Sequence, residues 1–393
     1  MNTVTKQNKP LDIVMLTTVR FHLAKGGTEK VMIETANALT QKGHHVTIIF
    51  RDKAGSASGF PLDSKVKLVN CASVKTPLWL ASAICDIRSF SFSKRVRDNK
   101  RTSLNLKTIA YRFREAINLN PADVYITYDS KLSAMLVREF NISQPVVTTF
   151  QFDPNHIIRR YNFESIKDLI AQAGPLQVLL PQFVQTIRSV LPQAKCVVIP
   201  NAVAQIRSCA KSTSSYILNI GRIMPLKNQL LLVKAMGIVN RQYPDWRVKI
   251  VGENHVDKDY TNQIKKFIHE NKLQNIVELT GPSNDVEKEF LSSSIFVFSS
   301  TSEGFGLALA EAMSAGLPCI GLKTCSAVSC LIRNGENGLL CENTPESLAE
   351  TIIRLIQDRD LRVRLGQQAK RDMKTYEPSA VWDQWENFLY SLI

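Results

Sequence analysis

The chain has 393 residues, of which 44% are hydrophobic and 21% charged, and its formal net charge is +14. These values are those of an ordinary soluble protein with two or three domains and room for two sizeable cores. No apolar stretch approaches the roughly 18 residues of a transmembrane helix, and the polar residues 1–10 predict no secretion signal. We therefore expect a cytoplasmic protein.

The eight cysteines are scattered along the chain without a Cys-x-x-Cys pair. Free thiols are a better interpretation than disulfides or a zinc site, in keeping with a cytoplasmic location. The histidines show no metal-like spacing either, so the sequence predicts no metal site.

Strands and helices are predicted to alternate along the whole chain, which is typical of α/β domains with parallel sheets. In the first half we expect a helix over residues 29–41, with Thr28 as its N-cap and Gly43 as its stop. Another helix is expected from about Lys131. The predicted strands of this half are Leu11–Leu16, Val46–Phe50, Val66–Asn70, Asp123–Thr127, Pro145–Phe150, Gln177–Leu180 and Cys196–Ile199.

The polar segment Ala204–Ser215 is predicted to be a linker before a second α/β unit. Strands are expected there at Tyr216–Ile220, Arg247–Val251, Ile276–Leu279, Ile295–Phe298 and Pro318–Gly321. Helices are expected at Asn228–Gln242, Asp259–Asn271, Val286–Ser292, Leu307–Ser314 and Pro345–Gln357. The pattern predicts two Rossmann-like domains, 1–203 and 204–375, followed by an amphipathic terminal helix within 376–393. Ligands of such sheets bind beyond the carboxyl ends of the strands.

The most informative segment runs from Ser302 to Gly316 and contains Glu303 and Glu311 on either side of a Gly-x-Gly turn. A buried strand precedes it, and strong helix formers follow it. The amides of residues 304–307 (Gly304, Phe305, Gly306 and Leu307) would open the helix, and its positive dipole end suits a phosphate. A carboxylate further along the helix can accept two hydrogen bonds from a sugar diol. The layout suggests a site for a nucleotide sugar.

Two cations follow the first strand of the second unit, in the run Gly221-Arg222-Ile223-Met224-Pro225-Leu226-Lys227-Asn228. Arg222 can bind phosphate oxygens as a fork and Lys227 as a point charge. Such cations can stabilise a diphosphate leaving group. The acidic residues of the chain are not interpreted as a cluster of magnesium ligands.

The string Glu-Gly-Phe-Gly…Glu-Ala-Met-Ser-Ala-Gly-Leu-Pro resembles the Glu-x7-Glu signature of retaining glycosyltransferases of the GT4 group. The resemblance implies the GT-B fold, in which two Rossmann-like domains face each other across a cleft and a C-terminal helix crosses back onto the first domain. It implies that Glu303 lies near the transferred sugar and that Glu311 accepts from the ribose hydroxyls. It also implies that Arg222 and Lys227 hold the donor diphosphate, and that the acceptor attacks from the front face of the sugar.

The same resemblance implies further donor contacts at glycine-rich turns. These are Gly26 and Gly27 after the first strand, Gly221, the turn with Asn254, and Gly281. Many relatives carry a histidine after the strand that here continues as Gln151-Phe152-Asp153, so Gln151 or Asp153 is the candidate on the acceptor side. A glutamate common in relatives is replaced here by Cys330.

Residues 88–114 contain nine lysines or arginines and a single acid, with aromatic residues between them. Such a segment can lie on an anionic membrane surface, and an ordinary solvated helix or loop fits it as well. No nucleic-acid motif accompanies the charge, so nucleic acid is not an expected partner.

We therefore expect a metal-independent, retaining glycosyltransferase that needs no cofactor besides its nucleotide-sugar donor. It would move a hexose or N-acetylhexosamine, preferably from a UDP-sugar, to a growing glycan that is lipid-linked or part of a surface polysaccharide. The protein could be peripheral on the inner face of the cell membrane. Two alternatives stay open: a sugar-nucleotide epimerase or small-acceptor synthase of the same fold, and a non-enzymatic basic protein that binds membrane or nucleic acid.

Overall fold

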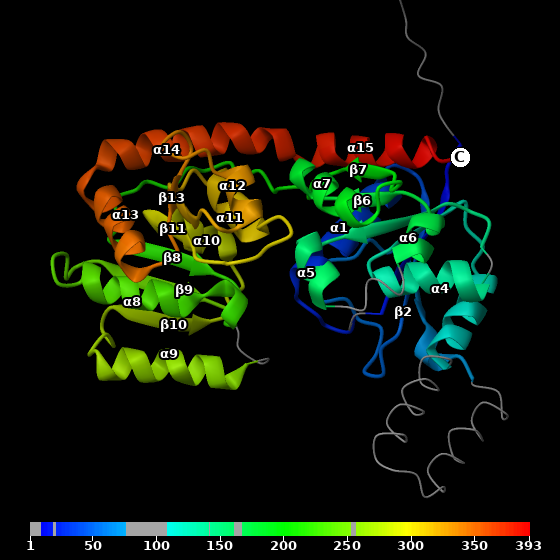
Figure 1. Ribbon diagram of the computed structural model, residues 1–393, viewed down its shortest axis with the longest axis horizontal. Coiled ribbons are helices and arrows are strands. Elements are labelled where there is room, and N and C mark those ends of the chain that lie inside the picture. Colours follow the sequence, from blue (N-terminus) through cyan, green and yellow to red (C-terminus); the bar gives the residue numbers. More distant parts are fainter. Residues whose placement is uncertain (1–8, 19–20, 76–107, 141, 161–166, 253–256) are drawn as a thin grey trace, which may run out of the picture. The chain divides into compact units, whose positions relative to one another are not determined.

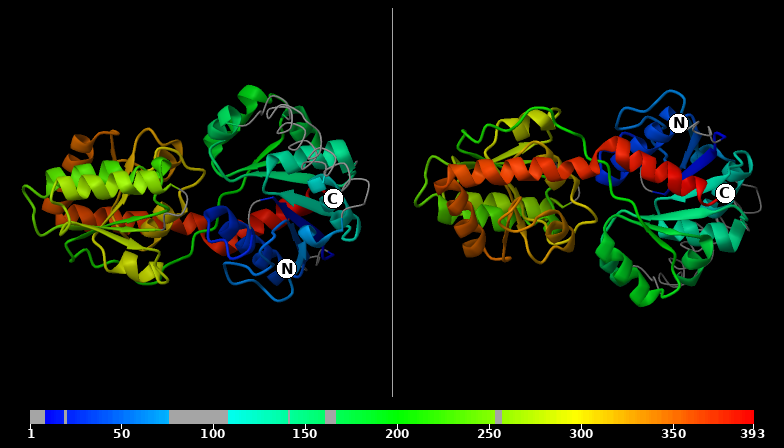
Figure 2. Two further views of the ribbon diagram at one scale, coloured as in Figure 1. Left: turned by 90° about the horizontal axis from the view of Figure 1, so that it is seen from below. Right: turned by 90° about the horizontal axis from the view of Figure 1, so that it is seen from above.

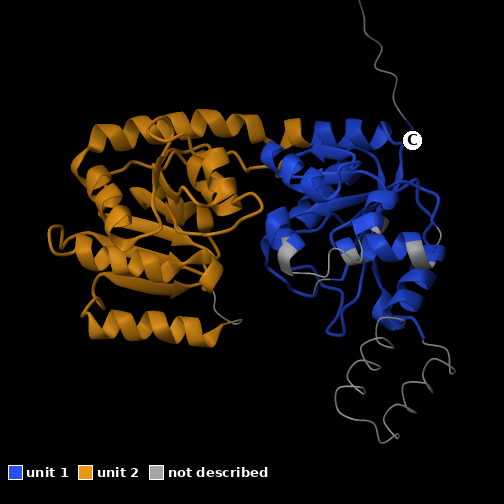
Figure 3. Cartoon of the chain, in the orientation of Figure 1, with its two compact units in different colours: residues 1–199, 382–393 blue, residues 200–381 orange. Residues whose placement is uncertain are grey.

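The computed structural model describes residues 9–18, 21–75, 108–140, 142–160, 167–252 and 257–393 (Figure 1). The chain forms two compact units (Figure 3). Unit 1 contains residues 1–199 together with 382–393, and unit 2 contains residues 200–381. In each unit the helices lie on both sides of a central sheet (Figures 1 and 2).

Unit 1 is built on a seven-stranded sheet in the order β3-β2-β1-β4-β5-β6-β7. Every pairing between its strands is parallel, with Ile13 of β1 beside both Val46 of β2 and Val124 of β4. The strands are β1 (Asp12–Thr17), β2 (His45–Phe50), β3 (Lys67–Asn70), β4 (Val124–Thr127), β5 (Val146–Phe150), β6 (Leu176–Val178) and β7 (Cys196–Val198). The helices are α1 (Gly27–Gln41), η1 (Cys71–Ser73), α4 (Ser130–Phe140), α5 (Pro154–Arg160), α6 (Lys167–Ala173) and α7 (Pro181–Val190).

The first helix begins earlier than its sequence predicted. Gly26 is the N-cap of α1, and its carbonyl accepts from the amide of Lys30 at 3.0 Å. Thr28 therefore lies inside the first turn and is not the cap. A glycine is a favourable N-cap, which is why the helix can extend back to it without a capping side chain.

Unit 2 is built on a six-stranded parallel sheet in the order β10-β9-β8-β11-β12-β13. Its strands are β8 (Tyr216–Ile220), β9 (Arg247–Val251), β10 (Val277–Gly281), β11 (Ile295–Phe298), β12 (Cys319–Leu322) and β13 (Leu339–Cys341). Its helices are η3 (Pro225–Lys227), α8 (Gln229–Val239), α9 (Lys258–Glu270), α10 (Val286–Leu291), α11 (Leu307–Ser314), α12 (Ser326–Leu331), α13 (Pro345–Gln357), α14 (Arg359–Asp372) and η4 (Met373–Tyr376).

The central strand β11 shows why this sheet needs helices on both sides. All four of its residues are buried, because a parallel strand in the middle of such a sheet is covered on each face. On one side α8 packs against α9 and α13, and α11 packs against α14. The resulting core is made of aliphatic side chains from the strands and helices of unit 2 alone.

The segment predicted to be a linker, residues 204–215, is bound to unit 2 along its length. The hydroxyl of Ser314 donates to the carbonyl of Ala204 at 2.8 Å and accepts from the amide of Ile206 at 3.1 Å. Further on, the amide of Ala210 donates to Ala315, and the buried Arg362 donates to the carbonyl of Ser212. The irregular backbone is thus satisfied by fixed partners, and the segment is a strap on unit 2.

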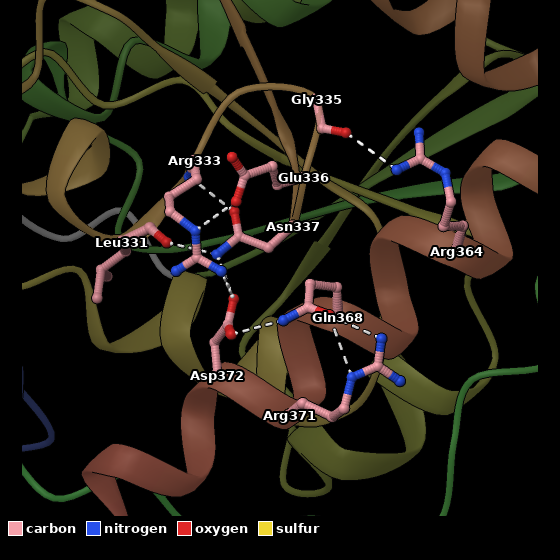
Figure 4. Close-up of polar contacts among 9 residues, drawn as sticks. All are labelled: Leu331, Arg333, Gly335, Glu336, Asn337, Arg364, Gln368, Arg371 and Asp372. Atoms are coloured by element: carbon pink, nitrogen blue, oxygen red, sulfur yellow. Dashed lines mark hydrogen bonds and ion pairs between the residues drawn. The ribbon is translucent and has the colours of Figure 1, made fainter.

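The turn before β13 is fastened to the end of α14 (Figure 4). The carboxylate of Asp372 accepts from Arg333 Nη2, Asn337 Nδ2 and Gln368 Nε2, each at 2.8 Å. Asn337 is fully buried and also donates to the carbonyl of Leu331 at 3.0 Å. We call Arg333, Asn337, Gln368 and Asp372 the turn clamp.

The terminal helix α15 (Pro378–Tyr390) is amphipathic, as predicted. Its buried residues Val381, Trp385 and Leu389 recur every fourth position, so they share one face. The end of the helix, from residue 382, belongs to unit 1, where the chain also begins (Figure 2). The expected return of this helix to the first domain is confirmed.

None of the described helices combines the length and the apolarity that crossing a bilayer requires. Most of the basic segment, residues 76–107, lies outside the described residues. Residues 108–118 are helical, and Phe113 is fully buried in the core of unit 1. This aromatic side chain therefore packs the core. The seven cysteines of the described chain are all free thiols.

Candidate active site

The strand order of unit 2 reverses between β8 and β11, which are neighbours in the sheet although 74 residues separate their ends. Ile217 of β8 lies beside Ile295 of β11, so the loops that follow these two strands leave the same edge together. In open α/β sheets, ligands bind outside the carboxyl ends of the strands at this switch point. The two loops carry the predicted cations and the first predicted glutamate.

Lys227 and Glu303 form an ion pair at this switch point. Lys227 Nζ lies 2.5 Å from Glu303 Oε1, and the two side chains are 23% and 13% exposed. The ammonium also lies 5.6 Å from the centre of the ring of Phe298, the buried last residue of β11. The predicted site residues of the two loops are thus in direct contact.

The backbone around Lys227 is fixed by the loop after β11. Its carbonyl accepts from Ser299 Oγ at 2.8 Å, and the carbonyl of Leu226 accepts from the amide of Thr301 at 2.9 Å. The next residue, Asn228, has the left-handed conformation with φ 52°, which turns the chain from η3 into α8. Arg222 is exposed, and its own carbonyl accepts from the buried Gln229.

The turn before α11 depends on a glycine. Gly306 is the N-cap of α11 with φ 88° and ψ 53°, a conformation that side chains other than glycine rarely adopt. Beside it Phe305 is buried, with its ring against Tyr376 at 5.4 Å between centres. The first amides of α11, from Leu307 onward, therefore open from a rigid turn. Glu311 follows in the second turn of α11 and is half-buried.

Glycines directly after β8 and β9 and at the end of β10 link three strand ends by hydrogen bonds. The amide of Gly221 donates to Val251 at 3.0 Å, and the amide of Gly252 donates to Gly281 at 2.9 Å. A Cβ on Gly252 would lie 1.9 Å from the carbonyl oxygen of Gly221, so no side chain fits there. The stem of Lys227 lies close to Gly221, where a Cβ would make an ordinary contact with Lys227 Cδ at 3.6 Å.

The remaining predicted residues belong elsewhere. Gly26 and Gly27 begin α1 of unit 1, and Gln151 and Asp153 follow β5 of the same unit. Gln151 donates to Gln177 at 3.4 Å, and a carboxylate oxygen of Asp153 accepts from the amide of Asn155. Asn254 lies outside the described residues. Within unit 2, the structure brings the loops with Lys227 and Glu303 together.

Sequence reasoning missed the supports of the site. Phe298 was predicted only as part of a buried strand and Ser299 was given no role, yet the Phe298 ring lies near the Lys227 ammonium and Ser299 Oγ donates to the Lys227 carbonyl. A signal for Ser299 was its place directly after the strand. Among the described residues, no group of three or more His, Cys, Asp or Glu side chains is arranged to hold a metal ion.

Comparison with known proteins finds a family match for unit 2. The family of glycosyl transferases group 1 matches residues 204–372, the range that contains every unit 2 residue of the site. Residues 204–372 of the chain are thus similar to the group 1 glycosyltransferases. It is 26% identical to an uncharacterized glycosyltransferase of Haemophilus influenzae over 93% of this chain and 96% of that protein.

Two further similar proteins have a named activity or a structure with bound ligands. An Escherichia coli UDP-Gal:alpha-D-GlcNAc-diphosphoundecaprenol alpha-1,3-galactosyltransferase is 32% identical over 37% of this chain and 37% of that enzyme. The crystal structure of an S. aureus TarM variant, solved with fondaparinux, alpha-GlcNAc-glycerol and UDP, matches 96% of this chain and 99% of that one. Its TM-score is 0.75 at 16% identity, which confirms the GT-B fold.

Proposed function

We propose that this glycosyltransferase is retaining and metal-independent, and that it moves a hexose or N-acetylhexosamine from a UDP-sugar to a growing glycan. The observation that carries the proposal is the switch point of unit 2. The loops with Lys227 and Arg222 and the first amides of α11 follow neighbouring strands at the same sheet edge. Lys227 contacts the carboxylate of Glu303 there. Positive groups next to a carboxylate suit a diphosphate joined to a sugar.

The reaction breaks the bond between the sugar C1 and the β-phosphate oxygen and forms a bond from C1 to the acceptor oxygen. The diphosphate leaves with the electron pair, and Lys227 and Arg222 stabilise its charge. The acceptor proton passes to the leaving phosphate oxygen, which keeps the new bond on the same face as the old one. Glu303 accepts hydrogen bonds from the sugar, and Glu311 accepts from the ribose. In this scheme the protein's own cations take the role of a metal.

We propose a lipid-linked or surface-polysaccharide glycan as the acceptor. The support is the E. coli relative named for a diphosphoundecaprenol acceptor and the TarM variant solved with alpha-GlcNAc-glycerol. The net charge of +14 also favours an anionic acceptor or membrane face. Gln151 and Asp153 of unit 1 are the proposed acceptor-side groups.

The first test is a thermal-shift panel of UDP, GDP, ADP and CMP and their sugars, with and without EDTA. Ligand at a hundredfold excess over its dissociation constant stabilises the native state by about 2.7 kcal/mol. We expect UDP and one UDP-sugar to raise the unfolding temperature equally with and without EDTA. Loss of the shift in EDTA would contradict metal independence, and no shift with any nucleotide would favour a non-enzymatic binder.

The second test is transfer itself. The donor found in the panel is incubated with a prenyl-diphosphate-linked sugar, and the product is examined by NMR for its anomeric configuration. We expect the configuration of the donor to be kept. An inverted product would contradict retention, and a donor converted to another nucleotide sugar without transfer would favour the epimerase alternative.

A further inference from the structure

The ammonium proposed to bind the diphosphate already has a partner. Lys227 Nζ lies 2.5 Å from Glu303 Oε1, and neither side chain is more than a quarter exposed. A shielded pair of this kind interacts more strongly than a surface pair, because less water screens its charges. Any diphosphate that comes to Lys227 must therefore compete with the carboxylate of Glu303.

Lys227 cannot easily move away from this carboxylate. Ser299 Oγ holds its carbonyl, and the stem of the side chain lies along the bare Cα of Gly221. The ammonium end rests near the ring of Phe298, which is buried and fixed in β11. Ser299 holds the backbone of Lys227 and Glu303 holds its ammonium, so the competition takes place where the pair now lies.

A nucleoside diphosphate and a nucleotide sugar affect Glu303 differently. The free diphosphate places more negative charge beside the carboxylate and offers it no donor in return. In the nucleotide sugar, the sugar is bonded to the β-phosphate and so lies next to Lys227, within reach of Glu303. Its hydroxyls donate to the carboxylate and replace part of what the ion pair loses.

We propose that the Lys227–Glu303 pair discriminates between the sugar donor and the spent nucleoside diphosphate, by making Glu303 a competitor of the bare diphosphate. This inference rests on the proposed function. It gives Glu303 a second role besides contact with the sugar: it weakens retention of the product after transfer. The pair makes the enzyme less sensitive to inhibition by its own product.

The test is calorimetric titration of UDP and of the UDP-sugar from the panel into wild type and E303Q. Glutamine keeps the shape of the side chain and removes its charge. We expect E303Q to bind UDP about tenfold more tightly, because a charge removed near Lys227 leaves the ammonium free for the phosphate. The ratio of UDP affinity to UDP-sugar affinity should rise, and transfer should be slower.

Unit 2 contains a matched control. Lys249 Nζ lies 3.8 Å from Glu289 Oε2 and 4.7 Å from the centre of the Tyr216 ring, and the pair has a similar exposure of 24% and 23%. E289Q should therefore lose a comparable charge without changing UDP affinity. E303A serves as a second variant, and unfolding without ligand checks that each variant is folded.

The two proposals fail in different ways. If wild type binds neither UDP nor any other nucleoside diphosphate, the proposed function fails, and the inference fails with it. If wild type binds UDP and transfers sugar but E303Q and E303A bind UDP no more tightly, the function stands and the discrimination is wrong. Equal gains for UDP and the UDP-sugar would also overturn it.

Discussion

At the scale of single residues, Lys227 is the group on which the site depends. It is 76 residues from Glu303 in the sequence, and its carbonyl, stem and ammonium each have a separate support. A side chain whose charged end is already paired with Glu303 and lies near the Phe298 ring has lost part of its rotamer freedom before any ligand arrives. Such preorganised charge is effective in catalysis because little reorganisation is needed when the leaving group develops its charge.

Replacement of Lys227 should therefore abolish most transfer. We expect K227A to lower kcat by about 100-fold or more, the usual cost of removing one preorganised donor from a charged transition state. K249A removes a lysine of almost equal exposure that also faces a glutamate and an aromatic ring. A radiolabelled transfer assay on both variants separates the roles, since an equal loss in K249A would point to general electrostatics or folding.

The sequence predicted that loops after two strands of unit 2 carry candidate site residues, but not that Lys227 and Glu303 are in contact. Gly221, Arg222 and Lys227 could be placed at a strand end from the apolar run before them, and so could Glu303. Their contact depends on β8 and β11 being neighbours, a tertiary fact that no local pattern contains. The role of Phe298 was hidden for the same reason, because a buried aromatic residue in a strand is usually core.

At the scale of elements, boundaries followed from burial. Strands such as β8, β9 and β11 have the predicted limits, since each is a short segment rich in apolar and β-branched residues. The three-residue β13 and the helix α14 were not predicted. The first is too short to show a period. The second is highly charged, and its N-cap Asp358 directly follows α13. Nothing apolar at this junction therefore marks the start of a separate helix.

The turn clamp connects these two unpredicted elements. We expect its central carboxylate, Asp372, to contribute to the free energy of unfolding. Burial opposes ionisation of Asp372, but hydrogen bonds from Asn337, Arg333 and Gln368 outweigh it and lower its pKa. The folded-state pKa thus lies below the unfolded one, so the stabilisation is present above the unfolded value and is lost as pH falls through the folded value.

We expect D372N to lower the free energy of unfolding at neutral pH by about 1–3 kcal/mol, because the substitution leaves buried donors without their charged acceptor. Thermal unfolding of wild type and D372N at neutral pH and near pH 3 tests this. The difference in stability between wild type and D372N should be smaller near pH 3 than at neutral pH. Q368A, which removes one donor and keeps the carboxylate, is the milder control, and a gap independent of pH would contradict the assignment.

At the scale of the whole molecule, the end of the chain is anchored to unit 1 by charged groups. Lys42 Nζ contacts Asp383 at 2.6 Å and Glu386 at 2.8 Å, just after α1 ends. The buried His44 accepts from the amide of Leu11 through Nδ1 at 3.1 Å. Its Nε2 therefore carries the hydrogen and faces Glu386 Oε1 at 3.3 Å, so the neutral ring fits both contacts.

This anchor predicts a loss of stability in mild acid. Burial lowers the pKa of His44 and outweighs the raising effect of Glu386. The unfolded chain therefore takes up a proton near its ordinary pKa of about 6.5 while the folded chain resists, so stability falls as pH drops below that value. H44Q can keep both hydrogen bonds without titrating. Between about pH 5 and pH 8, the free energy of unfolding should depend less on pH for H44Q than for wild type. An equal pH dependence in the two proteins would contradict the prediction.

The distribution of unit 1 over the sequence affects how the protein is made. Unit 2 is one continuous stretch, residues 200–381, whereas unit 1 includes residues 382–393 at the end of the chain. On the ribosome the first 199 residues emerge early but wait for the final turns of α15, whose Trp385 and Leu389 are buried. Synthesis of unit 2 therefore sets a delay during which the core of unit 1 is incomplete. Residues 382–393 can therefore complete unit 1 only after unit 2 has been synthesised.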